Sequence, residues 1–219
     1  NKELIFRCLD NIKDFKVIIV DNGADLFLKK QIEKNYKIYN YIINKKNLGY
    51  AKAANQGINE CDTNYILILG ADCLIGAKDI NVLVESQKKY NDCFITSPTF
   101  YDKNLNLNYS GGYLPENGDK ISPLKLEGDM CVESIISTAI LFTKKDINEI
   151  GKFDENFFLY YSDDDLCRRI KEKKKSVIQI FNASGQHTHG NLKVRNYIKK
   201  TFLRNYHYTY DELYYFYKI

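Results

Sequence analysis

Short apolar runs alternate with segments of helical spacing along this sequence, and this alternation constrains its fold more than any other feature. The apolar runs end in turn residues and lie at 15–20, 39–43 and 65–69, and the helical segments lie at 1–12, 26–36, 50–59 and 82–90. Buried strands that alternate with helices are typical of a twisted, mostly parallel sheet with helices on both faces. We therefore predict an α/β fold whose central sheet is mostly parallel and is flanked by helices.

The second half of the sequence is less regular. After a predicted strand at 93–97, the segment 102–129 is rich in Asn, Gly, Tyr and Pro, so we expect a long loop or an irregular hairpin. The remaining predicted elements are a strand at 132–142, a short helix at 143–150 closed by Gly151, a helix at 163–173 and a strand at 177–181.

Composition limits the class of protein. The chain has 219 residues, of which 44% are hydrophobic and 27% charged, as in a soluble globular domain with an appendage. No apolar run approaches the roughly 20 residues that a membrane helix needs. The six cysteines are scattered without metal-ligand spacing, which indicates a reducing compartment without disulfides or a zinc site.

The tail at 191–219 combines basic residues with many tyrosines and has helical spacing. Such a helix suits an anionic membrane surface or a nucleic acid. A solvated helix face, a helix packed on the main domain or a homodimer face are the alternatives. The net charge of the chain is only +4, and we predict no nucleic-acid partner.

Two acidic residues follow predicted strands. Asp21 comes after the run at 15–20, and Asp72 comes after the run at 65–69. Sheets of this kind bind ligands at the carboxyl ends of their strands, so both carboxylates are candidates for ligand contact. Asp21 suits an Asx-type turn equally well, because Asn22 and Gly23 follow it.

Three consecutive carboxylates, Asp163, Asp164 and Asp165, follow a run of aromatic residues and open a predicted helix. Like charges this close need a helix amino end, a cation or a metal beside them. One interpretation is helix capping, because Ser162 and Asp165 have the spacing of a capping box and Asp165 stands four residues before Arg169. The other interpretation is a general base placed in a cleft.

Five motifs occur in order: VDNGA at 20–24, NLGYAKAANQGI at 47–58, ILILGAD at 66–72, GKFDENFFLYYSDDDLCRR at 151–169 and QHTHG at 186–190. Together they resemble the inverting family 2 glycosyltransferases with the GT-A fold, in particular their bacterial rhamnosyltransferase-like branch. The resemblance implies a GT-A domain over 1–190, with a nucleotide-sugar-binding half at 1–100 and an acceptor and catalytic half at 101–190. The tail at 191–219 lies beyond it.

For the donor, the resemblance implies that Asp21 contacts the base or ribose of a UDP- or dTDP-sugar. It also implies that Asn47, Gly49 and Asn55 surround a helix start that approaches the diphosphate. From the local sequence alone, capping and tight helix packing explain the same three residues.

For the metal, the resemblance places Asp72 at the position of the metal-binding carboxylate in the D-x-D motif. Mg²⁺ or Mn²⁺ is the cation that such oxygen ligands suit. Gly70 stands where the motif has its first acid. His187 is expected to complete the coordination, with His189 as its close rival and a structural histidine as the alternative.

For the chemistry, the resemblance places Asp163 at the position of the catalytic base and Asp165 at that of a structural acid facing Arg169. Ser162 replaces the usual glutamate, and Asp164 has no assigned role. The implied enzyme is an inverting, metal-dependent hexosyltransferase that acts on the hydroxyl of a glycan or lipid-linked acceptor in cell-envelope polysaccharide synthesis. It is expected to be cytoplasmic and peripheral on the inner membrane face.

Two alternatives remain. A non-catalytic nucleotide- or sugar-binding relative is suggested by Gly70 and Ser162, and a nucleotidyltransferase would share the metal-binding carboxylate but should carry a Gly- and Arg-rich phosphate loop. The family's first strand is also missing before the helix at 1–12. Because its absence would leave unpaired edges on the neighbouring strands, we expect the sequence to be a piece of a longer chain.

Overall fold

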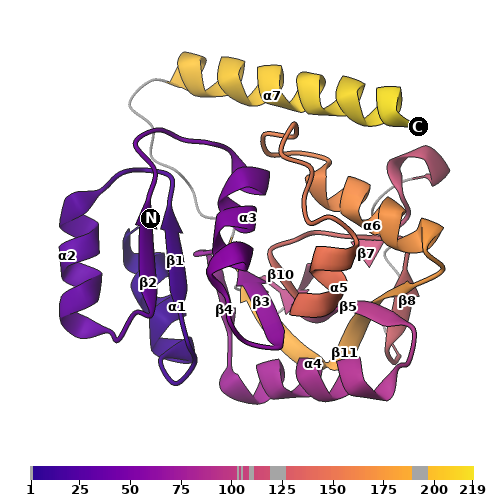
Figure 1. Ribbon diagram of the computed structural model, residues 1–219, viewed down its shortest axis with the longest axis horizontal. Helices are drawn as coiled ribbons and strands as arrows, with labels where there is room; N and C mark the ends of the chain where they lie inside the picture. The colour runs from indigo at the N-terminus through magenta and orange to yellow at the C-terminus, as the bar shows by residue number, and fades with distance from the viewer. Residues whose placement is uncertain (1, 103, 105, 109–110, 119–126, 189–196) are drawn as a thin grey trace.

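A small parallel sheet with its helices forms the amino-terminal part of the protein (Figure 1). The computed structural model describes residues 2–102, 104, 106–108, 111–118, 127–188 and 197–219. The first elements are α1 (Lys2–Ile12), β1 (Ile18–Asp21), α2 (Leu26–Asn35) and β2 (Asn40–Ile43). In the sheet, Ile18 pairs with Asn40 and Asp21 with Ile43. These elements match the helices and strands predicted for this part of the sequence.

The central sheet has seven strands in the order β3-β10-β5-β11-β4, with β6 beside β5 and β8 beside β11. The strands are β3 (Tyr65–Leu69), β4 (Cys73–Ile75), β5 (Cys93–Tyr101), β6 (Leu107–Asn108), β8 (Met130–Val132), β10 (Ala139–Thr143) and β11 (Ser176–His187). Among the described pairings of this sheet, β5 with β11 is parallel and the others are antiparallel. The prediction of a mostly parallel sheet is therefore wrong, because a buried strand is apolar whichever way it runs.

Helices cover both faces of this sheet. On one face, α3 (Tyr50–Glu60), α5 (Lys144–Glu149) and α6 (Ser162–Glu172) pack their apolar residues against Ile140 and Phe142 of β10. On the other face, α4 (Ala77–Lys89) packs against Leu141. Alternate residues of β10 thus point to opposite faces, as in any strand. The two layers of helix form the α/β arrangement that the sequence predicts.

Several predicted boundaries shift. β5 runs through Pro98 and β11 continues to His187, so both strands are longer than predicted. The predicted strand at 132–142 is instead divided among β8, β9 (Ser134–Ile135) and β10, and β9 pairs with β7 (Gly111–Gly112) in a separate small sheet. A short 3₁₀ helix, η1 (Pro115–Asn117), follows β7 within the predicted loop. Gly151 closes α5 with φ 90°, as predicted.

β1 and β3 are among the strands that have one edge without a partner strand in the described part of the chain. β1 pairs with β2 alone, and β3 pairs with β10 alone. Helix α3 packs against β1, where a Cβ on Gly57 would lie 3.6 Å from Val20 Cγ2.

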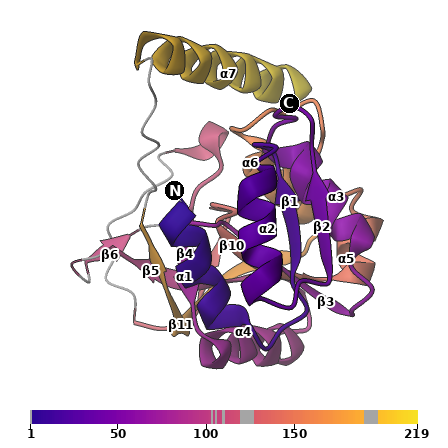
Figure 2. The same ribbon diagram turned by 90° about the vertical axis from the view of Figure 1, so that its left-hand side faces the viewer.

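The last helix, α7 (Tyr197–Lys218), is 22 residues long. Figure 2 shows it on the side of the molecule opposite α4, as Figure 1 does. One of its faces is packed on the domain, because Asp211 and Tyr215 are buried. Within the described ranges, we find no helix that is long and apolar enough to cross a membrane.

Candidate active site

The two predicted metal ligands lie together at the edge of the central sheet. Asp72 occupies the turn between β3 and β4, and His187 ends β11, where it pairs with Cys73 of β4. The distance between His187 Nε2 and Asp72 Oδ2 is 3.6 Å. Thr188 donates to the Asp72 carbonyl from its backbone N–H at 3.1 Å and from its hydroxyl at 2.9 Å, so the turn is tied to the strand end.

The space available in this turn explains why position 70 is a glycine. A Cβ at this position would lie 3.0 Å from Asp72 Oδ1, which is tighter than an ordinary van der Waals contact. The Gly70 N–H donates to the Thr138 carbonyl at 2.7 Å and keeps the turn against β10. A side chain at position 70 would therefore crowd the Asp72 carboxylate in its observed place.

The Asp72–His187 pair suits a divalent cation shared with a phosphate ligand. Carboxylate oxygen and imidazole nitrogen are both ligands that Mn²⁺ accepts, and Mg²⁺ prefers the oxygen. In the part of the chain that the structure describes, no three His, Cys, Asp or Glu side chains gather as a metal cluster. His189 lies outside the described residues, so His187 is placed here without its rival.

The predicted base is the one carboxylate of the acidic cluster that is partly exposed. Asp163 is half-buried, whereas Asp164 and Asp165 are fully buried. Its Oδ2 accepts the Ser137 N–H at 3.2 Å and its Oδ1 accepts the Asp164 N–H at 3.2 Å. These backbone donors hold the side chain in one orientation, which a general base needs.

The neighbouring carboxylates have structural partners. Asp164 accepts a 2.5 Å hydrogen bond from the Ser134 hydroxyl. Asp165 accepts from Arg169 Nε at 2.9 Å, as predicted, and from Lys218 Nζ of α7 at 2.6 Å. The sequence offered no signal for the Ser134 and Lys218 contacts, since these residues come from distant segments.

The predicted capping role of Ser162 is wrong. Tyr161 occupies the position before the first turn of α6, with φ 59°, and makes no side-chain capping bond. Ser162 is the first helical residue, and its buried hydroxyl has no hydrogen-bond partner among the described residues. Ser162 does not cap the helix because it is the first residue of the helix itself, and the capping position is the residue before it.

At the donor side, Asp21 forms the predicted Asx-type turn. Its Oδ1 accepts the Gly23 N–H at 2.7 Å, and its Oδ2 accepts the Asp25 N–H at 3.0 Å. Burial and the nearby Asp21 charge raise the pKa of Tyr41, whose hydroxyl donates to Asp21, to about 12. The Asp21 side chain is half-buried, and its contact with a ligand stays a prediction.

Gly49 is packed against the segment that precedes α6. Asn47 Oδ1 accepts the Gly49 N–H at 2.9 Å, and the Asn22 amide donates to the Gly49 carbonyl at 2.9 Å. The φ of Gly49 is 89°, and a Cβ there would lie 2.5 Å from the Phe158 carbonyl oxygen. Glycine is therefore required by a contact within the protein, and the approach of a diphosphate stays a prediction.

Asn55 ties α3 to the same segment. It is buried, its amide donates to the Phe153 carbonyl at 2.9 Å and to Glu155 Oε1 at 3.0 Å, and its oxygen accepts the Phe153 N–H at 3.1 Å. These contacts give Asn55 a structural role. A direct contact of Asn55 with a donor stays a prediction.

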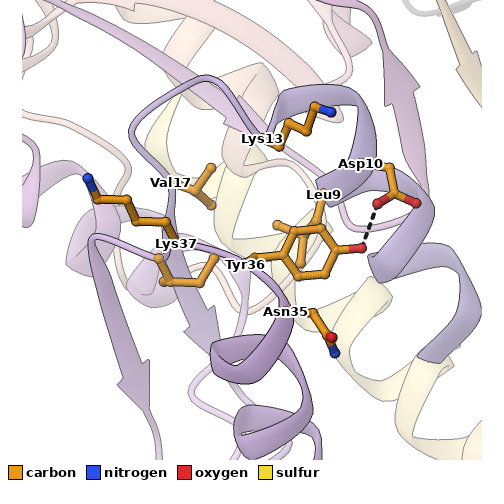
Figure 3. Close-up of a pocket in the computed structure, with 8 residues that line it drawn as sticks. Leu9, Asp10, Lys13, Val17, Asn35, Tyr36 and Lys37 are labelled. Carbon is orange, nitrogen blue, oxygen red and sulfur yellow. Dashed lines mark hydrogen bonds between the residues drawn. The ribbon is translucent and has the colours of Figure 1, made fainter.

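A cavity of about 400 Å³ lies elsewhere, between α1 and the turn from α2 to β2. Figure 3 shows its lining, in which the Tyr36 hydroxyl donates to Asp10 Oδ1 at 2.6 Å. That hydrogen bond raises the pKa of Tyr36 to about 12. The lining is Leu9, Asp10, Lys13, Val17, Asn35, Tyr36, Lys37 and Ile38, which includes none of the predicted site residues.

Comparison with known families and sequences gives consistent matches. The family described as glycosyl transferase family 2 matches residues 2–149. Rhamnosyltransferase WbbL of Escherichia coli K12 is 25% identical over 194 residues, which are 78% of this chain and 73% of the relative. dTDP-rhamnosyl transferase RfbF of Shigella flexneri is 29% identical over 163 residues, which are 70% of this chain and 53% of the relative.

One solved structure has a similar fold at low sequence identity. It is the crystal structure of GalNAc-T7 with UDP, GalNAc and Mn²⁺, with a TM-score of 0.61 and 13% identity. The match covers 80% of this chain and 38% of that chain. At this identity the likeness concerns the fold alone.

Proposed function

The chain belongs to glycosyl transferase family 2, and from this membership we propose that it transfers a sugar, with inversion, from a nucleotide-sugar to a hydroxyl acceptor. Its fold is the GT-A fold. One observation carries the proposal: Ser137 and Thr138 are adjacent, and they contact the predicted base and the predicted metal turn, respectively. The Ser137 N–H binds Asp163, and the Thr138 carbonyl accepts the Gly70 N–H beside Asp72.

Asp163 is the proposed base. Its carboxylate takes the proton of the acceptor hydroxyl while that oxygen attacks the anomeric carbon from the face opposite the diphosphate. The bond between the anomeric carbon and the phosphate oxygen breaks, and its electron pair stays on the leaving diphosphate. A divalent cation, when held by Asp72 and His187, supplies positive charge to that leaving group. One displacement at this carbon inverts its configuration.

The donor that we favour is a dTDP- or UDP-sugar. Support comes from the names of two relatives, one of which is a dTDP-rhamnosyl transferase, and from the UDP in the structural neighbour. The acceptor that we favour is a glycan or a lipid-linked glycan of the cell surface. The chain spans 73% and 53% of the two relatives' lengths, so these assignments concern the whole protein as proposals.

Replacement of the proposed base tests the mechanism. Asp163→Asn should lower kcat by about 10²- to 10⁴-fold, the usual contribution of a general base. The assay is transfer from radiolabelled nucleotide-sugars to a panel of acceptors with Mn²⁺. Asp92→Asn is the matched control, since Asp92 is exposed beside Lys175 and remote from the site. Full activity of a folded Asp163→Asn variant would remove Asp163 from this role.

The alternative is a relative that binds nucleotide-sugars without transfer. It is favoured by the small number of metal ligands among the described residues. Thermal shifts with nucleoside diphosphate and Mn²⁺, in a chain that turns over no donor with any acceptor, would support this alternative.

We further assign residues 1–190 to the catalytic domain and 191–219 to a surface-binding tail on the cytoplasmic face of the membrane. On helix α7, the exposed fractions of three apolar residues are 80% for Ile198, 67% for Phe202 and 67% for Leu213. Such a stripe suits the interface of an anionic bilayer. Flotation of the intact chain with phosphatidylglycerol vesicles tests this, and Phe202→Ser with Leu213→Ser should abolish it. Dimerisation without lipid binding would instead favour a homodimer face.

A further inference from the structure

Asp211 of α7 binds three consecutive backbone N–H groups of the segment before α6. Its Oδ1 accepts from Phe158 at 3.0 Å, and its Oδ2 accepts from Leu159 at 2.9 Å and from Tyr160 at 2.9 Å. The side chain is fully buried. Hydrogen bonds to a carboxylate are stronger than those between neutral groups. The Asp211 carboxylate therefore fixes the backbone of residues 158–160.

The same helix holds the residue at which α6 begins. The backbone of Tyr161 is left-handed, with φ 59°. For a residue other than glycine this conformation is unfavourable in free energy, and it persists only where the surrounding structure imposes it. Its hydroxyl lies 3.0 Å from the Tyr208 hydroxyl and donates to Glu212 Oε1 at 2.9 Å. Its ring lies 5.4 Å from the ring of Tyr215. All three partners belong to α7.

The end of α7 ties the beginning of the segment to the first turn of α6. Lys218 Nζ donates to Asp154 Oδ2 at 2.7 Å and to Asp165 Oδ1 at 2.6 Å. Helix α7 therefore contacts the segment 154–161 at its start, in its middle and at its end. Asp163 follows two residues after Tyr161, so its position depends on how this segment is held.

The loop at the donor side has supports of its own. The Phe158 carbonyl accepts the Tyr50 N–H at 2.5 Å, but Gly49 is also bound by Asn22 and Asn47. Loss of Asp211 should accordingly displace the start of α6 more than the loop at 47–49. This difference separates an effect on the base from an effect on donor binding.

We infer that Asp211 is a positioning residue for the transfer reaction: through the backbone of 158–160 it fixes Tyr161 and hence the proposed base Asp163. The inference rests on the proposed function for its catalytic meaning. Its structural content, that one carboxylate of α7 orders the start of α6, stands apart from that function and is measured separately.

The test uses the whole chain with Asp211→Asn. The amide group of Asn keeps the shape of the side chain, but its NH₂ must face at least one backbone donor. We expect kcat for transfer to fall about 10- to 100-fold, as for a misplaced catalytic group, while the KM for the nucleotide-sugar changes less than about threefold. Asp129→Asn is the matched control, because Asp129 also accepts a backbone N–H, from Phe181 at 2.9 Å, but far from the site.

Hydrogen exchange followed by mass spectrometry tests the structural content without any activity. In Asp211→Asn, the amides of 158–160 and of the first turn of α6 should exchange about tenfold faster or more, while β3 keeps its protection. Glu212→Gln, which weakens the bond to Tyr161, should show the same pattern more weakly and serves if Asp211→Asn fails to fold. Unchanged exchange at 158–166 in a folded variant would overturn the inference.

The two readouts separate two failures. If the wild-type chain transfers no sugar but the exchange result is as expected, the proposed function fails and the ordering of α6 by Asp211 stands. If the wild type is active and Asp211→Asn keeps its kcat, Asp211 is not a positioning residue. The same holds if kcat falls, the KM rises and the global stability falls together in this variant.

Discussion

The two ends of the proposed site are held in different ways. Around the base, the carboxylates of Asp164, Asp165 and Asp211 are fully buried, and each has a partner from a distant segment. At the donor side, Asp21 is half-buried and Asn47 is exposed, and each binds a backbone N–H two residues further on. Tertiary packing thus holds the base, whereas local turns shape the donor side. Substitutions should therefore cost folding stability at the first end and binding at the second.

The largest effect is expected at Asp165, which lies in the buried network. Asp165→Asn leaves Arg169 and Lys218 without their shared negative partner, so the free energy of unfolding should fall by about 3 kcal/mol. Urea denaturation measures it. Asp62→Asn is the control, because its ion pair with Lys16 is solvent-exposed and should contribute almost nothing. Equal losses in both variants would mean that the buried ion pairs stabilise the protein no more than the exposed one.

Gly49 is the point at which the two ends touch. Gly49→Ala places a Cβ 2.5 Å from the Phe158 carbonyl at φ 89°, so we expect about 1–3 kcal/mol of destabilisation from the strained backbone. A lower Tm should accompany weaker nucleotide binding, because the loop must move. Gly128→Ala is the matched control, since a Cβ there meets nothing within 4 Å. An unchanged Tm in Gly49→Ala would mean that the loop and the Phe158 carbonyl can move apart at little cost in free energy.

Asp72 lies in a turn at the sheet edge, so a substitution there should weaken ligand binding without changing the folding stability. Asp72→Asn should weaken Mn²⁺-dependent binding of a nucleoside diphosphate by about tenfold or more, equivalent to about 1.4 kcal/mol. Calorimetric titration measures the affinity, and urea denaturation without metal should give the free energy of unfolding of the parent. Equal affinities for parent and variant would remove Asp72 from the metal site.

The smallest effect concerns pH and the ion pair of Lys218 with Asp154. Burial raises the pKa of the Asp154 carboxyl, but the hydrogen bonds from Lys218, the Asn156 N–H and Tyr214, together with the charge of Lys218, outweigh this, and the pKa lies below the ordinary 3.8. Burial lowers the pKa of Lys218, but its two carboxylate partners outweigh this, and the pKa lies above the ordinary 10.5.

Stability from this pair should therefore be lost as pH falls below 3.8 through the Asp154 value and as pH rises above 10.5 through the Lys218 value. Lys218→Met should flatten both limbs of a plot of unfolding free energy against pH. Limbs of unchanged slope in this variant would assign the pH dependence to other groups.

The sequence predicted local structure well where periodicity or a turn residue decides it. The helices α1, α2 and α3 and the strand β3 begin and end within about two residues of the prediction, and Gly151 closes α5 as expected. Strand direction was predicted wrongly, because an apolar run carries no information about its partner. Pro98 was taken as the end of a strand, whereas pairing with β11 extends β5 past it.

For the site, the order of the motifs was enough to assign the family and to name Asp72, His187 and Asp163. The sequence also determined that three carboxylates would stand side by side at a helix start. Only the tertiary structure decided which of them is accessible. Successive residues of a helix point about 100° apart, so the burial of each depends on what packs against α6 from that direction. Ser134 of β9 covers Asp164, and Lys218 of α7 covers Asp165. Asp163 alone faces outward, beside the Ser137 N–H.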